Sequence, residues 1–205
     1  MRLGRRTALV SAVVVACLVV AGTASATSSA KPRVTLIGDS IAESFDYVPS
    51  ARRHLGRGLD LRSDTAVCRR LVASSCTFQG VQPATALDLI RGQGSALGPV
   101  VVINVGYNDW AAVYDVDKVM RALKAAHVRT VVWVTLRETT SNYAQNNARI
   151  TKATRRWRNL VVADWNAYSR GKPWFRADGL HLTTTGATGL SRLLRPLVLA
   201  GISGS

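Results

Sequence analysis

Residues 100–110 read VVVINVGYNDW, and this stretch decides the fold class. Its first residues, VVVINV, are nearly all apolar and β-branched, which is typical of a strand covered by helices on both faces. A glycine and a polar turn, Gly106 to Asp109, follow at once. A second run of the same kind, TVVWVTL at 130–136, indicates that the chain builds a buried parallel sheet.

Five short apolar runs alternate with segments of helical character. The runs lie at 34–37, 59–62, 100–104, 130–135 and 160–164, and the helical segments at 40–55, 83–91, 114–127, 144–157 and 184–200. Apolar residues recur at helical three- and four-residue steps in the third and fifth of these segments, at Val116, Val119, Met120 and Leu123 and at Leu190, Leu193, Leu194 and Leu197. The alternation predicts an α/β fold, a three-layer α/β/α sandwich on a five-stranded parallel sheet, in one domain over residues 33–205.

The N-terminus has the three regions of a secretory signal peptide. Arg2, Arg5 and Arg6 precede an apolar run at 8–21, and small residues end at Ala26. We expect cleavage after Ala26, a flexible lead-in at 27–32, and a secreted or cell-wall-associated product with no stable membrane span. An uncleaved anchor and a twin-arginine address stay open as alternatives.

The charge of the chain restricts its partners. Loss of the signal peptide would leave 24 basic and 12 acidic residues, a formal charge of +12. Outside the cell this charge favours anionic cell-wall polymers, acidic glycans or lipid surfaces, and nucleic acid is not an expected partner. The alternative is a basic, solvated surface without a dedicated partner.

The mature chain would keep two cysteines, Cys68 and Cys76. In an oxidising compartment we expect them to form one disulfide. Two cysteines without neighbouring histidines do not make a zinc site, so no metal is predicted. The glycine-rich stretch GQGSALG at 92–98 precedes a strand instead of following one, and we predict no dinucleotide or other cofactor.

Polar residues follow three parts of the predicted sheet. They are Gly38-Asp39-Ser40, Gly106-Tyr107-Asn108-Asp109 and, after a longer loop, Asp178-Gly179-Leu180-His181. Ligands of open parallel sheets bind beyond the carboxyl ends of the strands. The topology therefore gathers a serine, an asparagine, an aspartate and a histidine at one rim.

These residue types suit nucleophilic catalysis. A serine needs a base to take its proton, and the base needs a third group to fix its tautomer. Ser40 is the candidate nucleophile, His181 the base and Asp178 its orienting carboxylate, since residues three apart on a turn lie on the same side. The alternatives are that Ser40 or Asp39 caps a helix and that Asp178 and His181 are ordinary loop residues.

The reacting carbonyl also needs hydrogen-bond donors where negative charge develops. The N–H of Ser40 and the side-chain amide of Asn108 are candidates, although Asn108 could be an ordinary turn residue. We expect Asp109 to be the supporting partner of Asn108 or a helix cap. Four residues near the site are candidates for a substrate pocket, with core packing as the alternative for the tryptophans: Asp39, Tyr107, Trp110 and Trp174.

The three motifs resemble blocks I, III and V of the SGNH/GDSL hydrolase superfamily, in the same order and after predicted strands. The resemblance implies a flavodoxin-like α/β/α sandwich without a cofactor. It also implies that Ser40 is the nucleophile, that Asp178 and His181 complete a triad, and that Asn108 is an oxyanion donor. The activity it implies is ester hydrolysis through an acyl-serine intermediate.

The resemblance departs from the family at block II. The stretch DTAVCRRL at 64–71 is similar to that block with Cys68 in the place of its glycine. The backbone N–H of Cys68, held by a disulfide, would be the second oxyanion donor, and Gly80 is the alternative.

We expect a secreted esterase that removes short or acetyl O-acyl groups from a glycan or a lipid-like ester. An acyltransferase with the same triad and a non-catalytic basic wall-binding module are the alternatives.

Overall fold

The computed structural model describes residues 30–204, so the signal peptide and residues 27–29 of the lead-in predicted at 27–32 lie outside the described residues. The chain forms one parallel sheet with strand order β2-β1-β3-β4-β5. Its strands are β1 (Arg33–Gly38), β2 (Asp60–Thr65), β3 (Val100–Asn104), β4 (Thr130–Val134) and β5 (Leu160–Ala163). The predicted five-stranded parallel sheet is confirmed.

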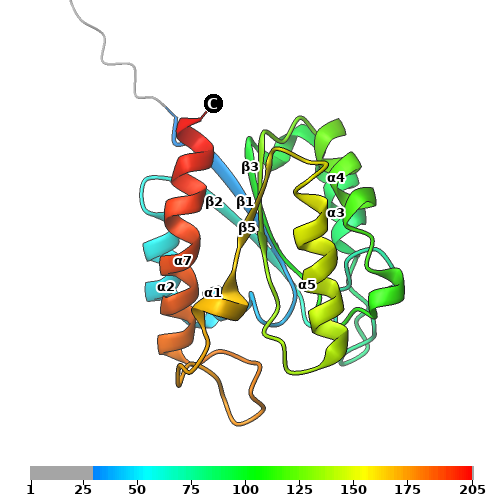
Figure 1. Ribbon diagram of the computed structural model, residues 1–205. Coiled ribbons are helices and arrows are strands. Elements are labelled where there is room, and N and C mark those ends of the chain that lie inside the picture. The colour runs from blue at the N-terminus through cyan, green and yellow to red at the C-terminus, as the bar shows by residue number, and fades with distance from the viewer. Residues whose placement is uncertain (1–29, 205) are drawn as a thin grey trace, which may run out of the picture. The chain divides into compact units, whose positions relative to one another are not determined.

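Helices cover both faces of the sheet (Figure 1). One face is covered by α3 (Ala86–Gln93), α4 (Val116–Ala125) and α5 (Ser141–Ala153), with the short 3-10 helices η1 (Gly94–Leu97) and η2 (Ala111–Val113) nearby in the chain. The other face is covered by α1 (Ser44–Tyr47), α2 (Pro49–Gly56), α6 (Trp165–Tyr168) and α7 (Thr184–Ser203). The predicted three layers are therefore confirmed.

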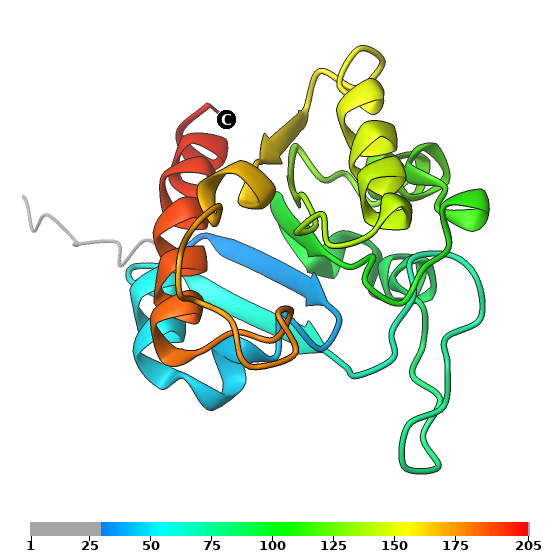
Figure 2. The same cartoon turned by 60° about the horizontal axis from the view of Figure 1, so that its bottom comes forward.

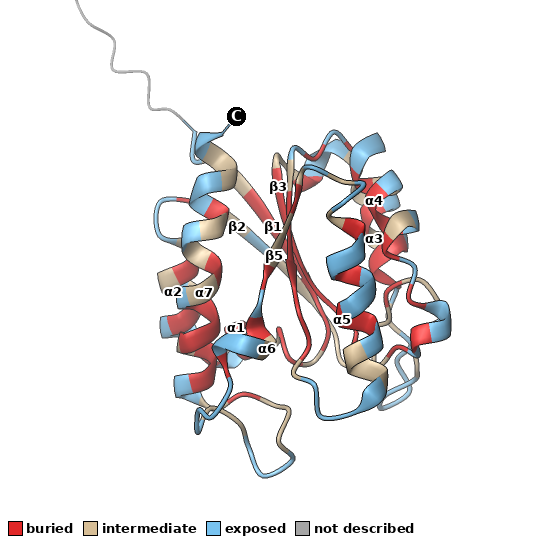
Figure 3. Ribbon diagram, in the orientation of Figure 1, coloured by how far each residue is buried: buried red, intermediate tan, exposed pale blue. Residues whose placement is uncertain are grey.

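Strand β3 shows why its sequence is apolar throughout. All of its residues are buried, and alternate side chains enter opposite layers. Val101 and Ile103 join the core under α3, α4 and α5, whereas Val100 and Val102 join the core under α7. The buried residues along the sheet are visible in Figure 3. Burial on both faces leaves no place for polar residues until the strand ends.

Two elements differ from the sequence-based expectation. The helix predicted at 40–55 is divided into α1 and α2, because Pro49 opens a new helix and the preceding Val48 is not helical. Strand β2 extends to Thr65, beyond the apolar run at 59–62. It is an edge strand and only partly buried, so its second half carries polar residues.

Long loops leave the carboxyl ends of the strands, as the turned view in Figure 2 shows. The loop after β2 runs to α3 and contains the Cys68–Cys76 disulfide that the sequence predicted. The longest helix, α7, has 20 residues and carries Pro196. Among residues 30–204, no helix is both long enough and apolar enough to span a bilayer.

Candidate active site

Ser40, His181 and Asp178 lie in a continuous hydrogen-bonded chain. The Oγ of Ser40 is 3.1 Å from Nε2 of His181, and Nδ1 of His181 is 2.7 Å from Oδ2 of Asp178. Ser40 follows β1, whereas the other two residues lie on the loop before α7. The fold thus joins two motifs from opposite ends of the described chain.

A tight turn presents His181 to Ser40. Oδ1 of Asp178 accepts the backbone N–H groups of Leu180 at 2.8 Å and His181 at 2.9 Å. The hydrogen bond from Leu180, followed by that from the His181 side chain, lowers the pKa of Asp178 to about 2. Gly179 adopts φ +71°, a left-handed conformation that favours glycine. Asp178 is therefore both the partner of the imidazole and the residue that shapes the turn.

Arg137, which follows β4, contacts the loop that carries Asp178 and His181. Its guanidinium donates to the carbonyl of Gly179 and lies 3.9 Å from the ring centroid of Phe175. Its backbone N–H donates to the hydroxyl of Tyr107 at 2.7 Å. Arg137 and Tyr107 thus tie the loops after β3 and β4 to the histidine loop.

Ser40 lies on a turn before α1, whereas the sequence placed it at the start of a helix. The carbonyl of Asp39 accepts from the N–H groups of Ala42 at 3.1 Å and Glu43 at 3.3 Å, which closes the turn. The turn is so tight that a Cβ on Gly38 would lie 2.1 Å from the Cβ of Ala42. Glycine is required there because of this close approach.

Asp39 occupies a different place from the one expected of a pocket residue. It is completely buried, and its carboxylate accepts backbone N–H groups from Ile41 at 3.1 Å, Gly106 at 3.0 Å and Tyr107 at 3.1 Å. Burial raises the pKa of Asp39 to about 6, although these hydrogen bonds oppose the shift. With no exposed surface to meet a substrate, Asp39 joins the β1 loop to the β3 loop.

Asn108 and Asp109 bind the segment that contains Cys68. The side-chain amide of Asn108 donates to the carbonyl of Arg69 at 3.2 Å, and the backbone carbonyl of Asn108 accepts from Nε of Arg70 at 2.8 Å. Both carboxylate oxygens of Asp109 accept from the N–H of Leu71, at 3.0 and 3.1 Å. Burial raises the pKa of Asp109 to about 7. Asp109 thus holds Leu71, whereas the sequence suggested that it supports Asn108 or caps a helix.

Cys68 has a backbone conformation that usually requires glycine. Its φ is +69°, and it is bonded through its side chain to Cys76, whose N–H also donates to the Cys68 carbonyl at 3.3 Å. The disulfide and this hydrogen bond hold a non-glycine residue in a left-handed conformation, which costs energy in a free chain.

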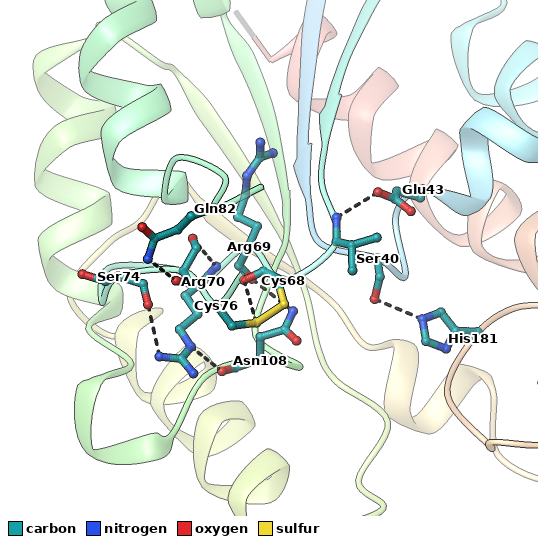
Figure 4. Close-up of a disulfide and its surroundings, with 12 residues drawn as sticks. Ser40, Glu43, Cys68, Arg69, Arg70, Ser74, Cys76, Gln82, Asn108 and His181 are labelled. Carbon is teal, nitrogen blue, oxygen red and sulfur yellow. Dashed lines mark hydrogen bonds between the residues drawn. A yellow bond between two sulfur atoms is a disulfide. The ribbon is translucent and has the colours of Figure 1, made fainter. Parts of the chain in front are cut away.

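The backbone N–H groups that the sequence singled out as donors are free to bind a ligand. Among residues 30–204, the N–H of Ser40 and the N–H of Cys68 have no hydrogen-bond acceptor. Gly80, the alternative donor, lies instead at an exposed turn whose ends, Phe78 and Val81, exchange two backbone hydrogen bonds of 2.9 Å. In Figure 4, Cys68, Cys76 and Asn108 lie on one side of Ser40 and His181 on the other. This arrangement favours Cys68 over Gly80.

The candidate aromatic residues divide into a rim residue and packing residues. Trp110 is 63% exposed, and the guanidinium of Arg70 lies 4.4 Å from its ring centroid. Trp174 stacks on Trp165 with ring centroids 5.6 Å apart and closely approaches α7, where a Cβ on Gly189 would lie 2.8 Å from the Trp174 ring. Trp174 thus fits the packing alternative. Trp110 is an exposed residue two positions after Asn108, with Arg70 over its ring.

Sequence reasoning missed two residues that anchor the loop after β2. Arg69 is buried and donates to the carbonyls of Gly38 and Ala84 and to the carboxylate of Asp64. Glu43 accepts the N–H of Val67 at 2.9 Å. No local pattern marks either residue, because their partners are distant in the sequence. In the part of the chain that the structure describes, no group of three or more potential metal ligands occurs.

The fold and the Ser40–His181–Asp178 chain define the class: an α/β/α sandwich with a serine–histidine–aspartate site at the carboxyl ends of its strands. No protein-family model matches the sequence, and no curated protein matches it either.

Solved structures do match. A carbohydrate acetylesterase family member from Sinorhizobium meliloti superposes with a TM-score of 0.62 at 15% identity, covering 83% of this chain and 99% of that one. A psychrotrophic esterase from Pseudoalteromonas sp. gives 0.57 at 11% identity, covering 85% of this chain and 100% of that one. A family 3 carbohydrate esterase from Clostridium thermocellum gives 0.52 at 15% identity, covering 82% and 98%. At such identities the likeness establishes a shared fold, the three-layer α/β/α sandwich with a parallel sheet that the sequence predicts.

Proposed function

We propose that the protein is a serine ester hydrolase that removes short O-acyl groups through an acyl-Ser40 intermediate. The observation that carries the proposal is the chain of two hydrogen bonds, 3.1 Å from Ser40 to His181 and 2.7 Å from His181 to Asp178. A serine hydroxyl becomes a useful nucleophile only with such a base beside it.

The geometry supports a two-step mechanism. As Oγ of Ser40 attacks the ester carbon, Nε2 of His181 accepts its proton, and Asp178 holds Nδ1–H and stabilises the imidazolium. The carbonyl oxygen becomes an oxyanion that can accept from the N–H groups of Ser40 and Cys68 and from the Asn108 amide. His181 then protonates the leaving alkoxide. In the second step a water molecule, deprotonated by His181, releases the acid and restores Ser40.

An O-acylated glycan is the substrate class that we favour over a lipid-like ester. Two of the structural neighbours are named as carbohydrate esterases, and the first of these as an acetylesterase. The exposed ring of Trp110, two residues after Asn108, offers a flat apolar surface beside the site.

The openness of the site favours hydrolysis over acyl transfer. The side chains of His181 and Asp178 are 39% and 47% exposed, so water has direct access to the base. An acyltransferase would need to exclude water from the acyl-serine. The non-catalytic wall-binding alternative leaves the Ser40–His181–Asp178 chain without a purpose.

Secretion is part of the proposal. The Cys68–Cys76 disulfide fits an oxidising compartment, which agrees with the signal peptide expected at residues 1–26.

The test is covalent trapping and turnover. The protein purified without residues 1–26 should hydrolyse an aryl acetate, and a fluorophosphonate probe should label Ser40. We expect Ser40→Ala to lose labelling and at least about 10³-fold in kcat. Ser203→Ala, an exposed serine at the end of α7, is the matched control and should behave as the wild type. Retained turnover in a folded Ser40→Ala protein would exclude Ser40 as the nucleophile.

The substrate class is tested separately. We would compare acetylated oligosaccharides with glycerol esters of increasing acyl length, and follow partition between water and an added sugar acceptor. Preference for long-chain glycerol esters would overturn the glycan assignment, and dominant transfer to sugar would overturn hydrolysis.

A further inference from the structure

A concave site lies at the end of the sheet opposite to the loops that carry Ser40 and His181. A groove of about 770 Å³ is formed at the C-terminal end of α2 and the first residues of β2. Its floor includes Leu59 and Leu61, and Lys31, just before β1, also lines it. These segments lie at the amino ends of β1 and β2, whereas Ser40 follows the carboxyl end of β1. The groove therefore belongs to the opposite end of the sheet.

The lining of this groove, hereafter the basic groove, carries an excess of positive charge. Among its charged residues, Arg52 is paired with Asp46 at 2.6 Å. The single lining acid, Asp60, is shared between Arg33 at 2.9 Å and Arg62 at 3.0 Å. Three further cations in the lining have no carboxylate within 4.0 Å among residues 30–204, and all three are exposed: Lys31, Arg53 and Arg57.

Helix α7 adds to this charge. Arg195 donates to the carbonyls of His54 and Leu55, at 3.1 and 3.0 Å, which closes the C-terminal end of α2. His54 lines the basic groove, and its pKa is lowered by burial and then by the charges of Arg195, Arg57 and Arg192. Cations from both helices therefore converge on one neutral imidazole.

We propose that the basic groove binds a linear polymer bearing closely spaced oxyanions, phosphate or carboxylate. Guanidinium groups match the geometry of both anions, and the unpaired cations gain partners on binding. A concave site suits a chain better than a flat bilayer. The exposed large apolar side chains that could enter a bilayer, such as Phe78, Val81 and Trp110, lie outside the basic groove. Such binding would hold the protein on an anionic polymer while Ser40 stays accessible.

The chain offers a charge-matched control for the test. Arg53→Ala/Arg57→Ala removes two exposed cations from the basic groove, and Arg155→Ala/Arg158→Ala removes two exposed cations beyond α5 that form no ion pair with any residue in 30–204. Both variants have the same net charge. Binding to inorganic polyphosphate and to polygalacturonate would be titrated calorimetrically against neutral dextran at several salt concentrations.

We expect the groove variant to bind about tenfold more weakly, with a salt-dependence slope lower by about 1 to 2, and the control to stay within about twofold of wild type. The two polymers distinguish phosphate from carboxylate as the preferred anion. Equal losses in both variants would overturn the proposal, because binding would then follow net charge alone. Hydrolysis of an aryl acetate should be unchanged in both.

The imidazole resonance of His54 reports where the polymer binds, independently of how tightly it binds. The His54 imidazole resonance should move on polymer binding, and the pKa of His54 should rise as the bound anions offset Arg57, Arg192 and Arg195. A vesicle of phosphatidylglycerol is the remaining arm. Binding that shifts His54 with vesicles but with neither polymer would overturn the polymer assignment in favour of a membrane surface.

Discussion

The two sides of Ser40 are built in opposite ways (Figure 4). On the histidine side, residues 176–183, the contacts that orient the imidazole lie within three residues, between Asp178 and His181, and both of these side chains are partly exposed, although Arg137 also holds the loop through Gly179. The cysteine side, residues 66–76, is held by a disulfide and by the buried carboxylate of Asp109, 38 positions from its partner Leu71.

The difference follows from what each side would do in catalysis. A general base must gain and lose a proton in each step and exchange it with water, so exposure suits His181. Oxyanion donors must already point at the developing charge, and any freedom to reorient lowers their effect. A covalent link and buried hydrogen bonds provide that rigidity on the cysteine side. In the proposed mechanism, proton transfer would thus occur on a local, partly exposed turn, and the oxyanion would be stabilised by a segment held through long-range contacts.

The largest loss of activity is expected from Asp178→Asn, which tests whether the turn on the histidine side orients the imidazole. The amide keeps an oxygen that can accept from Leu180 and His181, so the turn should persist, but its NH₂ group would face Nδ1 and favour the wrong imidazole tautomer. We expect kcat to fall by about 10³- to 10⁴-fold. Steady-state kinetics with an aryl acetate gives the loss, and the urea midpoint should stay near that of wild type because Asp178 is exposed.

The pH dependence of the activity tests the same role of Asp178. The pKa of Asp178 is about 2, so its carboxylate stays ionised across the range in which the protein is assayed. Protonation of Asp178 should therefore add no step to the loss of activity on the acid side of the profile. A second acid-side ionisation near pH 4 would mean that Asp178 is not held by the turn as described.

The next largest effect should come from the cysteine side. Cys68→Ser/Cys76→Ser removes the link that closes a loop of eight positions and should lower the free energy of unfolding by about 2 to 3 kcal/mol. Loosening the Cys68 N–H should reduce kcat by about 10- to 100-fold. Chemical denaturation and aryl ester kinetics measure the two losses.

Cys68→Gly/Cys76→Ser is the matched variant. Glycine adopts φ +69° without the Cβ penalty, so we expect this variant to keep more activity than the double serine variant while it also lacks the disulfide. Equal activity in both would show that the left-handed conformation of Cys68 does not matter to the oxyanion donor.

The contrast between local and long-range contacts also explains which features the sequence could predict. Strand β3 was placed at its observed residues because burial on both faces demands an unbroken apolar run. Asp178 and His181 were paired because their spacing alone puts them on one turn. Asp39 was misplaced because its partners, Gly106 and Tyr107, lie 67 and 68 positions away. Likewise the end of β2 and the anchoring role of Arg69 depend on edge position and long-range contacts, which leave no periodic signal.

A smaller effect is expected on the pH dependence of stability, through the buried Asp109 of the cysteine side. Burial raises the pKa of Asp109 to about 7, so the folded protein keeps its proton while the unfolded chain ionises near its ordinary value of 3.8. The free energy of unfolding should therefore fall as pH rises from about 4 to 7, by on the order of 4 kcal/mol, and then level off. Asp39, with a pKa of about 6, contributes in the same direction.

Asp109→Asn tests the assignment, because the amide keeps an acceptor for Leu71 but cannot ionise. Urea unfolding at pH 4, 5.5 and 7 should give a flatter profile than in wild type. An unchanged slope would place the titration elsewhere.

The smallest effect is expected at the outer edge of the cysteine side, at Trp110. Its ring is exposed and held by Arg70, so it contributes little to the core and can meet only the part of a substrate beyond the acyl group. We expect Trp110→Ala to raise KM for an acetylated oligosaccharide by about fivefold, the value of one aromatic contact. The kcat/KM for an aryl acetate should change less than about twofold, since that substrate has no sugar to stack. Trp110→Phe should restore most of the affinity. Equal losses on both substrates would instead mean that Trp110 supports Asn108 and the oxyanion donors, and the sugar-stacking role would be excluded.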